Sequence, residues 1–165
     1  MIAENTLNLL EFPKLLRVIS TFSHSNASEK AVLDIFPLND QGEIETRLGR
    51  IAEIRRMSHE GSPLKLTQFS DVAPLLHTIR PEGAVLESTE LSAFMPFLAI
   101  VDDISSRTKE QEAIPFLSEL TARLTGFPDI LALLKRSMDS EGAILDSASP
   151  ALSELRGQVR RLEGG

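Results

Sequence analysis

The stretch DSEGAILDSASPALSELRGQVRRL, residues 139–162, decides the fold expected for the end of this chain. Gly142 opens a short segment, 143–146, that is typical of a small β-hairpin between helices. Ser149 and Pro150 signal a helix start, because serine caps a helix and proline fits its first position. Apolar residues then recur at spacings of three, four and three, as in the a/d seam of a coiled coil: Leu152, Leu155, Val159 and Leu162.

The length of this seam leaves two interpretations open. It covers about one and a half heptads, whereas three to four are needed to assign a coiled coil from pattern alone. An ordinary amphipathic helix fits the same spacing. The pattern by itself therefore predicts a helix with one apolar edge, and the function of that edge is undecided at this point.

Helical spacing also dominates the rest of the chain. The clearest case is a helix after Asp40, in which four apolar residues share one face: Ile44, Leu48, Ile51 and Ile54. A later helix opens at 87–90 and continues to Ile104, with Pro96 expected to kink it or to free one carbonyl. Residues 105–112 are polar and are expected to form a loop. We predict an all-α fold with at most a small β-hairpin near 142–147.

Composition excludes several classes of protein. The chain has 165 residues, which fits one domain with a hydrophobic core. Its 17 Lys and Arg face 24 Asp and Glu, and the net charge of −7 argues against a free-standing binder of nucleic acid or anionic membranes. The absence of cysteine excludes disulfides, thiolate metal sites and a cysteine nucleophile. No signal peptide and no bilayer-spanning stretch is recognisable, so we expect a cytoplasmic protein without membrane contact.

Motifs that carry chemistry are not found. No Gly-Lys pair and no G-x-G-x-x-G occurs, so neither a P-loop nor a dinucleotide fingerprint is present. The three histidines lack metal-ligand spacing. A calcium loop counted from Asp139 fails, because its sixth and twelfth positions are Ile144 and Pro150. We therefore predict no catalytic, cofactor-binding or metal-binding residue and no enzyme activity in this chain.

Charged clusters offer weaker signals. Four arginines on the helix after Asp40 could contact phosphate, but interspersed glutamates favour a solvated helix: Arg47, Arg50, Arg55 and Arg56. The adjacent Asp102 and Asp103 are interpreted as a solvated face. On the last helix, three arginines remain candidates for nucleic-acid contact: Arg156, Arg160 and Arg161.

A family resemblance extends this interpretation. Residues 139–156 resemble the block just before the long lever helix of the MutS superfamily, in particular of its second bacterial subfamily, the paralogues with a C-terminal Smr nuclease domain. The stretch TLNLLEF, residues 6–12, is similar to that subfamily's opening, and residues 75–86 lie where its proteins have a related stretch. Phe12-Pro13-Lys14 lacks the Phe-x-Glu wedge of mismatch-reading MutS proteins, so mismatch reading is not expected.

The resemblance implies a division of the chain. Residues 1–148 would be a helical core domain, 149–163 the start of a lever or coiled-coil helix, and 164–165 a truncation or tag remnant. Six residues would carry the family motif in a structural role: Gly142, Asp146, Ser149, Pro150, Leu152 and Leu155.

The resemblance also implies a function for the parent protein. It would be a homodimeric ATPase and endonuclease that uses ATP and Mg, acts on DNA or ribosomes, and suppresses recombination or rescues collided ribosomes. Its ATPase and nuclease segments would lie beyond these residues, so no catalytic residue can be transferred to this chain. The fragment would anchor the lever arms that couple the ATPase state to a nucleic-acid clamp. The alternative is a helical protein-interaction module that contacts the ribosome or a second subunit.

Overall fold

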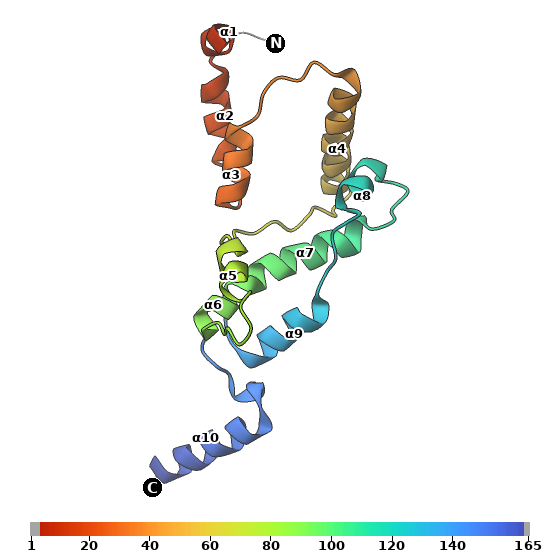
Figure 1. The fold of residues 1–165 in the computed structure, drawn as a ribbon. Coiled ribbons are helices and arrows are strands. Elements are labelled where there is room, and N and C mark those ends of the chain that lie inside the picture. The colour runs from red at the N-terminus through yellow and green to blue at the C-terminus, as the bar shows by residue number, and fades with distance from the viewer. Residues whose placement is uncertain (1–3, 164–165) are drawn as a thin grey trace. The chain divides into compact units, whose positions relative to one another are not determined.

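The computed structural model describes residues 4–163 (Figure 1). Within them the chain forms α-helices and one short 3-10 helix, and no strand, which confirms the all-α prediction. The elements are α1 (Glu4–Leu9), α2 (Phe12–Ser20), α3 (Asn26–Leu33), α4 (Gln41–His59), α5 (Ala73–Thr78), α6 (Ser88–Ser92), α7 (Phe94–Thr108), α8 (Pro115–Thr121), α9 (Pro128–Ser137), η1 (Asp146–Ala148) and α10 (Pro150–Glu163). No helix in this part of the chain is both long and apolar enough to cross a bilayer.

Prolines mark where many of these helices begin. A proline occupies one of the first two positions of α2, α5, α8 and α9, and Pro150 begins α10. An N–H in the first turn of a helix has no partner within that helix, so the N–H that proline lacks costs no hydrogen bond at these positions. Pro96 follows the same rule: α6 ends at Ser92, and Pro96 falls in the first turn of α7. The break falls where Pro96 acts, because the carbonyl four residues before it, that of Ser92, cannot receive an N–H from proline; this agrees with the expected kink or freed carbonyl.

The loop predicted at 105–112 is shorter in the structure, because α7 continues to Thr108. The hydroxyl groups of Ser106 and Thr108 donate hydrogen bonds to carbonyls in the preceding turn of the same helix. These polar residues can therefore extend the helix rather than end it.

The chain divides into two compact units, a division that length alone did not indicate. The first holds the described residues up to Asp71 together with Asp103–Thr125, and the second holds Val72–Asp102 and the described residues from Gly126 onward. The predicted boundary between 148 and 149 concerns function and stays a prediction. Residues 164–165 lie outside the described residues, so their predicted origin also stays open.

In the first unit α2 packs on α1 and α3, and α4 packs on α8. The buried residues Met57, Ile114 and Leu117 form a small core, covered by Leu64. The backbone of α4 approaches α8 closely at Gly49, where an added Cβ would lie 2.5 Å from the Phe116 ring.

The apolar face predicted on α4 does not meet this core. Leu48, Ile51 and Ile54 are exposed, whereas Glu53 and Met57 are buried. The reason is the contact with α8, which uses the opposite side of α4. There Gly49 leaves room for the Phe116 ring, and Glu53 accepts hydrogen bonds from the start of α8.

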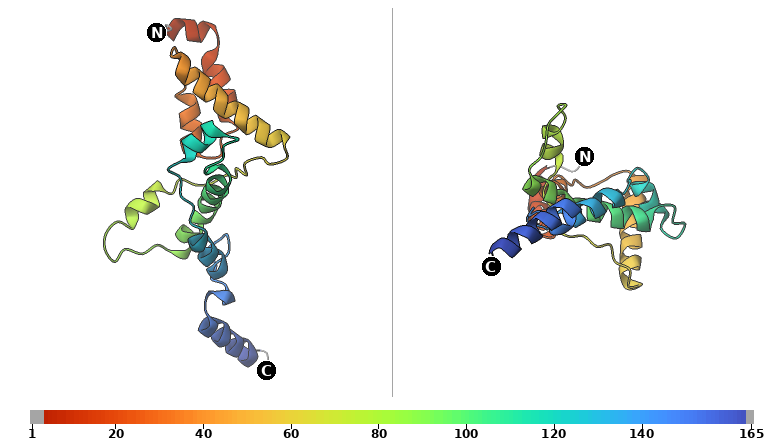
Figure 2. Two further views of the ribbon diagram at one scale, coloured as in Figure 1. Left: turned by 90° about the vertical axis from the view of Figure 1, so that its right-hand side faces the viewer. Right: turned by 90° about the horizontal axis from the view of Figure 1, so that it is seen from below.

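In the second unit the core joins α7 and α9. The buried residues Met95, Leu98, Leu131 and Met138 pack together, with Leu91 and Leu134 among the partly buried residues against them. The Asp102 carboxylate accepts a hydrogen bond from the N–H of Phe127, just before α9, at 2.6 Å. Figure 2 shows α9 followed by η1 and then α10, which contacts η1.

Candidate functional site: the base of the C-terminal helix

A tight turn leads from α9 to the C-terminal helix. Met138 pairs with Ile144 in a single antiparallel β-bridge, and the Leu145 N–H donates to the Ser137 carbonyl at 2.9 Å. The small hairpin predicted near 142–147 is thus reduced to one bridge that begins before Gly142, and residues 146–148 form η1 instead. Asp139 folds the turn, since its Oδ1 accepts from two backbone N–H groups, of Glu141 and Ala143, each at 2.9 Å.

Gly142 is required at the tip of this turn for two reasons. Its φ is 86°, in the left-handed region that favours glycine. An added Cβ would also lie 2.7 Å from both the N and the Cα of Thr89 in α6. The turn therefore seats against the backbone of α6, which explains the glycine predicted as a motif residue.

The start of α10 is capped as the sequence indicates. The Ser149 hydroxyl oxygen accepts from the Leu152 N–H at 3.1 Å, and Pro150 is the first helical residue. Just before it, the Ser147 hydroxyl donates to the carbonyl of Arg136 in α9 at 2.7 Å. Local capping and one link to α9 thus fix where α10 begins.

Asp146 holds two arginines of α10 from outside the helix. Arg156 donates to Asp146 Oδ1 at 2.7 Å and to the Ile144 carbonyl at 2.9 Å, and Arg160 pairs with Asp146 Oδ2. The hydrogen bond from Arg156, followed by that from Arg160, lowers the pKa of the Asp146 carboxyl group below its ordinary value. This cluster spans the first three turns of α10 and fixes its direction relative to the preceding turn.

The apolar edge of α10 is uncovered. Leu155, Val159 and Leu162 are 59, 50 and 83% exposed, and Leu152 is half-buried. No residue of α10 is buried. The first four motif residues, from Gly142 to Pro150, thus form the base of α10, whereas Leu152 and Leu155 belong to the apolar edge, which is exposed from Leu155 onward.

The three arginines proposed for nucleic-acid contact lie in different surroundings. Arg156 and Arg160 are engaged with Asp146, whereas the exposed Arg161 donates to the Gly157 carbonyl of its own helix, at 3.2 Å. Arg47 on α4 pairs with Glu43 at 2.8 Å, and Arg56 donates to the Ala113 carbonyl. Among residues 4–163 no group of three His, Cys, Asp or Glu side chains could hold a metal ion.

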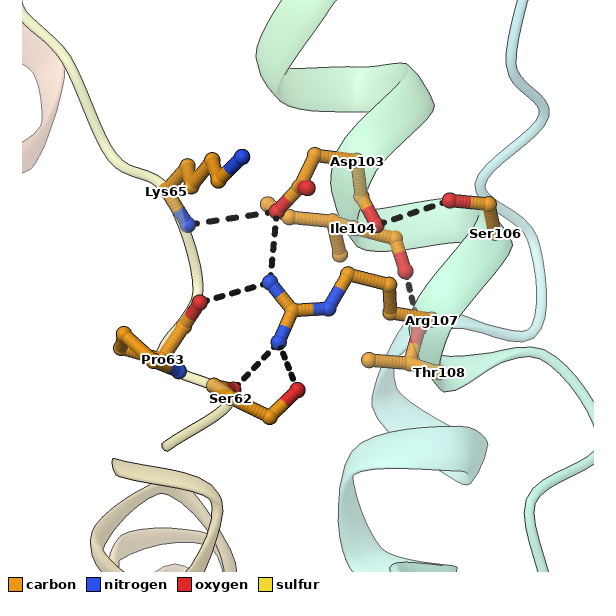
Figure 3. A network of polar contacts seen from close by, with 8 residues as sticks. All are labelled: Ser62, Pro63, Lys65, Asp103, Ile104, Ser106, Arg107 and Thr108. Atoms are coloured by element: carbon orange, nitrogen blue, oxygen red, sulfur yellow. Dashed lines mark hydrogen bonds and ion pairs between the residues drawn. The ribbon is translucent and has the colours of Figure 1, made fainter. Parts of the chain in front are cut away.

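A polar network in the first unit was not predicted from the sequence (Figure 3). Arg107 donates to the Pro63 carbonyl at 2.6 Å, to the Ser62 hydroxyl at 2.5 Å and to Asp103 Oδ2 at 3.2 Å. Asp103 Oδ2 also accepts from the Lys65 N–H at 3.2 Å. Asp102 and Asp103, interpreted as a solvated face, are half-buried, and both carboxylates also accept hydrogen bonds from loop backbone. The spacing of four between Asp103 and Arg107 could have indicated their ion pair.

Fold and site together define a class: an all-α segment that ends in a helix with a fixed base and an exposed heptad edge. No protein-family model matches the chain. It is similar to proteins named Endonuclease MutS2: 29% identical over 161 residues to that of Symbiobacterium thermophilum, 25% over 161 to that of Caldicellulosiruptor saccharolyticus, and 27% over 165 to that of Bacillus velezensis.

Each of these alignments covers 97% of this chain but only 20 or 21% of the relative. The chain therefore spans about one fifth of the length of the curated relatives it matches. The resemblance to the second MutS subfamily, MutS2, is confirmed over nearly the whole chain.

Proposed function

We propose that this chain is the non-catalytic core domain, residues 1–148, of a MutS2-like cytoplasmic ATPase and nuclease, with residues 149–163 as the root of its lever arm. In this proposal ATP and Mg bind elsewhere in a homodimeric parent, which acts on DNA or ribosomes, in recombination suppression or ribosome rescue. The observation that carries the proposal is the pairing of a fixed base with a free apolar seam on α10.

A lever transmits movement only if its base does not bend. The base of α10 has contacts in several directions: Gly142 against α6, Ser147 to α9, and Asp146 to Arg156 and Arg160. Because these contacts come from outside α10, a rotation of the domain would carry the helix with it. The exposed seam is then available for a second arm helix at heptad spacing.

In this proposal the isolated chain itself binds nucleic acid only weakly. Asp146 neutralises part of the charge on Arg156 and Arg160, and the whole chain carries −7. We expect weak DNA binding with a shallow salt dependence, since few phosphates would be neutralised. Tight binding with a steep negative salt slope in a DNA titration would contradict this expectation.

The lever proposal can be tested by extending α10. An antiparallel coiled-coil hairpin in heptad register is fused after Glu163, and its rotational correlation time is measured by NMR relaxation. We expect the hairpin to tumble with the domain. It should become more mobile when Asp146→Asn weakens the ion pairs with Arg156 and Arg160. Glu154→Gln is the matched control, because it changes a carboxylate on α10 that takes no part in the Asp146 ion pairs. A hairpin that tumbles independently in the unsubstituted fusion would refute the proposal.

A second candidate function, a helical protein-interaction module, is favoured by apolar side chains away from α10. Phe22 and Phe36 of the α1–α3 region are 76 and 70% exposed, and α4 exposes Leu48 and Ile51. A shallow groove among α1, α2 and the segment after α3 is lined by apolar residues that include Leu16 and Phe36. Its partner would be the ribosome or a second subunit. Co-sedimentation with ribosomes, compared between the unsubstituted chain and Phe36→Asp, tests the first of these.

A further inference from the structure

The outer side of α2 carries an exposed apolar stripe. Three of its members lie within about 100° of one another on the helix, and the fourth follows just after the helix ends. The opposite side of α2 is the one that packs, since Leu16 and Ser20 are buried. We call the following four residues, which are 53, 60, 42 and 76% exposed, the α2 stripe: Leu15, Val18, Ile19 and Phe22.

Helix α4 exposes a second apolar stripe on the side away from α8. Ile44, Leu48 and Ile51 lie within about 60° of one another, and we call them the α4 stripe. Leu48 and Ile51 are 59 and 52% exposed, and Ile44 is half-buried. Glu53 and Met57 lie on the opposite side, where they are buried near α8. Each stripe extends over about 10 Å of helix, so the two stripes match in length.

The helix between these two stripes in sequence, α3, is joined to α4 at both of its ends. After α3, residues 34–40 lead directly into α4. Before α3, the His24 carbonyl accepts a hydrogen bond at 3.1 Å from the N–H of Phe69, in the segment that follows α4. These two links define an axis along α3. Because α2 packs on both α1 and α3, a rotation about that axis would carry α1 and α2 as one body.

The order of the helices fixes how the stripes would meet. The short turn at 21–25 brings α3 back along α2, and the links at both ends of α3 place it antiparallel to α4. Helices α2 and α4 therefore run in the same direction. Contact between the stripes buries no charged side chain, so it carries no penalty for an unpaired charge. It sets three pairs level: Leu15 with Ile44, Ile19 with Leu48, and Phe22 with Ile51.

The total exposed surface fits an open arrangement of these helices. The accessible area is 12,270 Å² for a mass of 18.2 kDa, whereas two separate compact units of these sizes would expose about 9,800 Å² together. The α2 and α4 stripes contribute to this excess. Both belong to the first unit, so they can cover each other without a partner.

We propose that α1–α3 form a hinged cover, which turns about α3 and closes the α2 stripe onto the α4 stripe. The structure describes the open state, in which both stripes are exposed. Since residues 34–40 link the two stripes, their effective concentration is about millimolar, which favours closure through a single helix pair.

Closure would regulate the second candidate function. It hides Phe22, Leu48 and Ile51, three of the exposed apolar residues that favour a protein-interaction module. The open state presents them to a partner, and the closed state withdraws them. This regulatory role rests on the second candidate function, whereas the closure itself is independent of it and of the lever proposal.

Engineered disulfides test the cover directly, because the chain contains no cysteine of its own. Ile19→Cys/Leu48→Cys joins the middle of the two stripes. Arg17→Cys/Leu48→Cys is the matched control, since Arg17 is exposed and lies about 160° around α2 from Ile19. After oxidation at low protein concentration, the first variant should lose both free thiols to a disulfide within one chain. The control should keep both, because cysteines with Cα atoms more than about 7 Å apart cannot be bridged.

Far-UV circular dichroism before oxidation confirms that the helices are formed, and Phe22→Cys/Ile51→Cys repeats the test if the first variant does not fold. Retention of both thiols in the stripe variant would overturn the inference. So would equal disulfide formation in the control, because α2 would then approach α4 without a preferred side. A disulfide between two chains, seen as a doubled mass on a non-reducing gel, would also overturn it.

Co-sedimentation with ribosomes separates the cover from the function that it regulates. The oxidised Ile19→Cys/Leu48→Cys chain should co-sediment less than the same chain in its reduced form. If the disulfide forms but neither form co-sediments, the ribosome as partner is refuted and the closure stands. Equal co-sedimentation of the two forms would overturn the regulatory role.

Discussion

Helices α8 and α10 are each held by a closely packed glycine and a hydrogen-bonding carboxylate, but in different surroundings. Each relies on a glycine where backbone and neighbour approach closely: Gly49 against the Phe116 ring of α8, and Gly142 before α10. Each also relies on one carboxylate. Glu53, only 6% exposed, accepts from the Phe116 and Leu117 N–H groups, whereas the Asp146 side chain, 41% exposed, accepts from two arginines.

Because they differ in burial, the two carboxylates contribute differently. The N–H groups at the start of α8 have no partner within the helix, and burial makes the Glu53 carboxylate essential to them. Asp146 competes with water and salt for its arginines, so it orients α10 without holding the fold together. Glu53 therefore stabilises the first unit, whereas Asp146 orients α10, whose apolar edge is exposed.

The largest effect is expected for Gly142→Ala. Alanine at a positive φ costs about 1–2 kcal/mol, and the Cβ would also overlap the Thr89 backbone, which adds about 1–3 kcal/mol. Gly83→Ala is the matched control, since Gly83 has a φ of 81° but nothing within 4 Å of the added Cβ. Urea denaturation should show the loss for Gly142 exceeding that for Gly83. Equal losses would show that the turn does not seat on α6.

Next comes Glu53→Gln, which keeps the shape of the side chain but removes its charge and one acceptor. One N–H at the start of α8 loses its partner, and we expect a loss of about 2–3 kcal/mol in the free energy of unfolding. Glu112→Gln, at an exposed position, is the control and should change stability little. Faster amide hydrogen exchange in α8 would locate the effect. Unchanged stability would mean that α8 is held by apolar packing alone.

A smaller effect of opposite sign is expected for Gly157→Ala in α10. Nothing lies within 4 Å of an added Cβ there, and alanine favours a helix interior over glycine by about 0.5–1 kcal/mol. Helix content and α10 amide protection should rise. A decrease in either would show that another segment contacts this side of α10.

The smallest effect is expected at Asp146, and it depends on pH. Its pKa is lowered in the folded chain by Arg156 and Arg160. The stabilising contribution is therefore complete above the unfolded value, about 3.9, and is lost as the pH falls through the lower folded value. The Asp146 carboxyl chemical shift, followed by NMR titration, should give a midpoint below that of Asp146 in Arg156→Gln. Identical midpoints would show that the arginine does not hold the carboxylate.

The features that sequence predicted correctly are local ones. Ser149 and Pro150 act within a few residues of their position, and Gly142 was found through its local turn, although its contact with Thr89 in α6 was not. The all-α class followed from helical spacing, and the MutS2 resemblance rested on the same C-terminal block.

The features that sequence did not predict depend on partners far along the chain. Glu53 binds α8 across more than sixty residues, and Arg107 binds a loop more than forty residues away. The orientation of α4 was missed for the same reason. Periodicity identified its apolar face, but only the position of α8 shows that this face is exposed.

The account of α10 is tested most directly by NMR along that one helix in the unsubstituted chain. We predict slow amide exchange for residues 152–157, comparable to α9, together with strong relaxation of the Leu155, Val159 and Leu162 methyl groups by a soluble paramagnetic agent. Fast exchange from the first turn of α10 onward, or methyl groups shielded from the agent, would contradict a fixed base with a free seam.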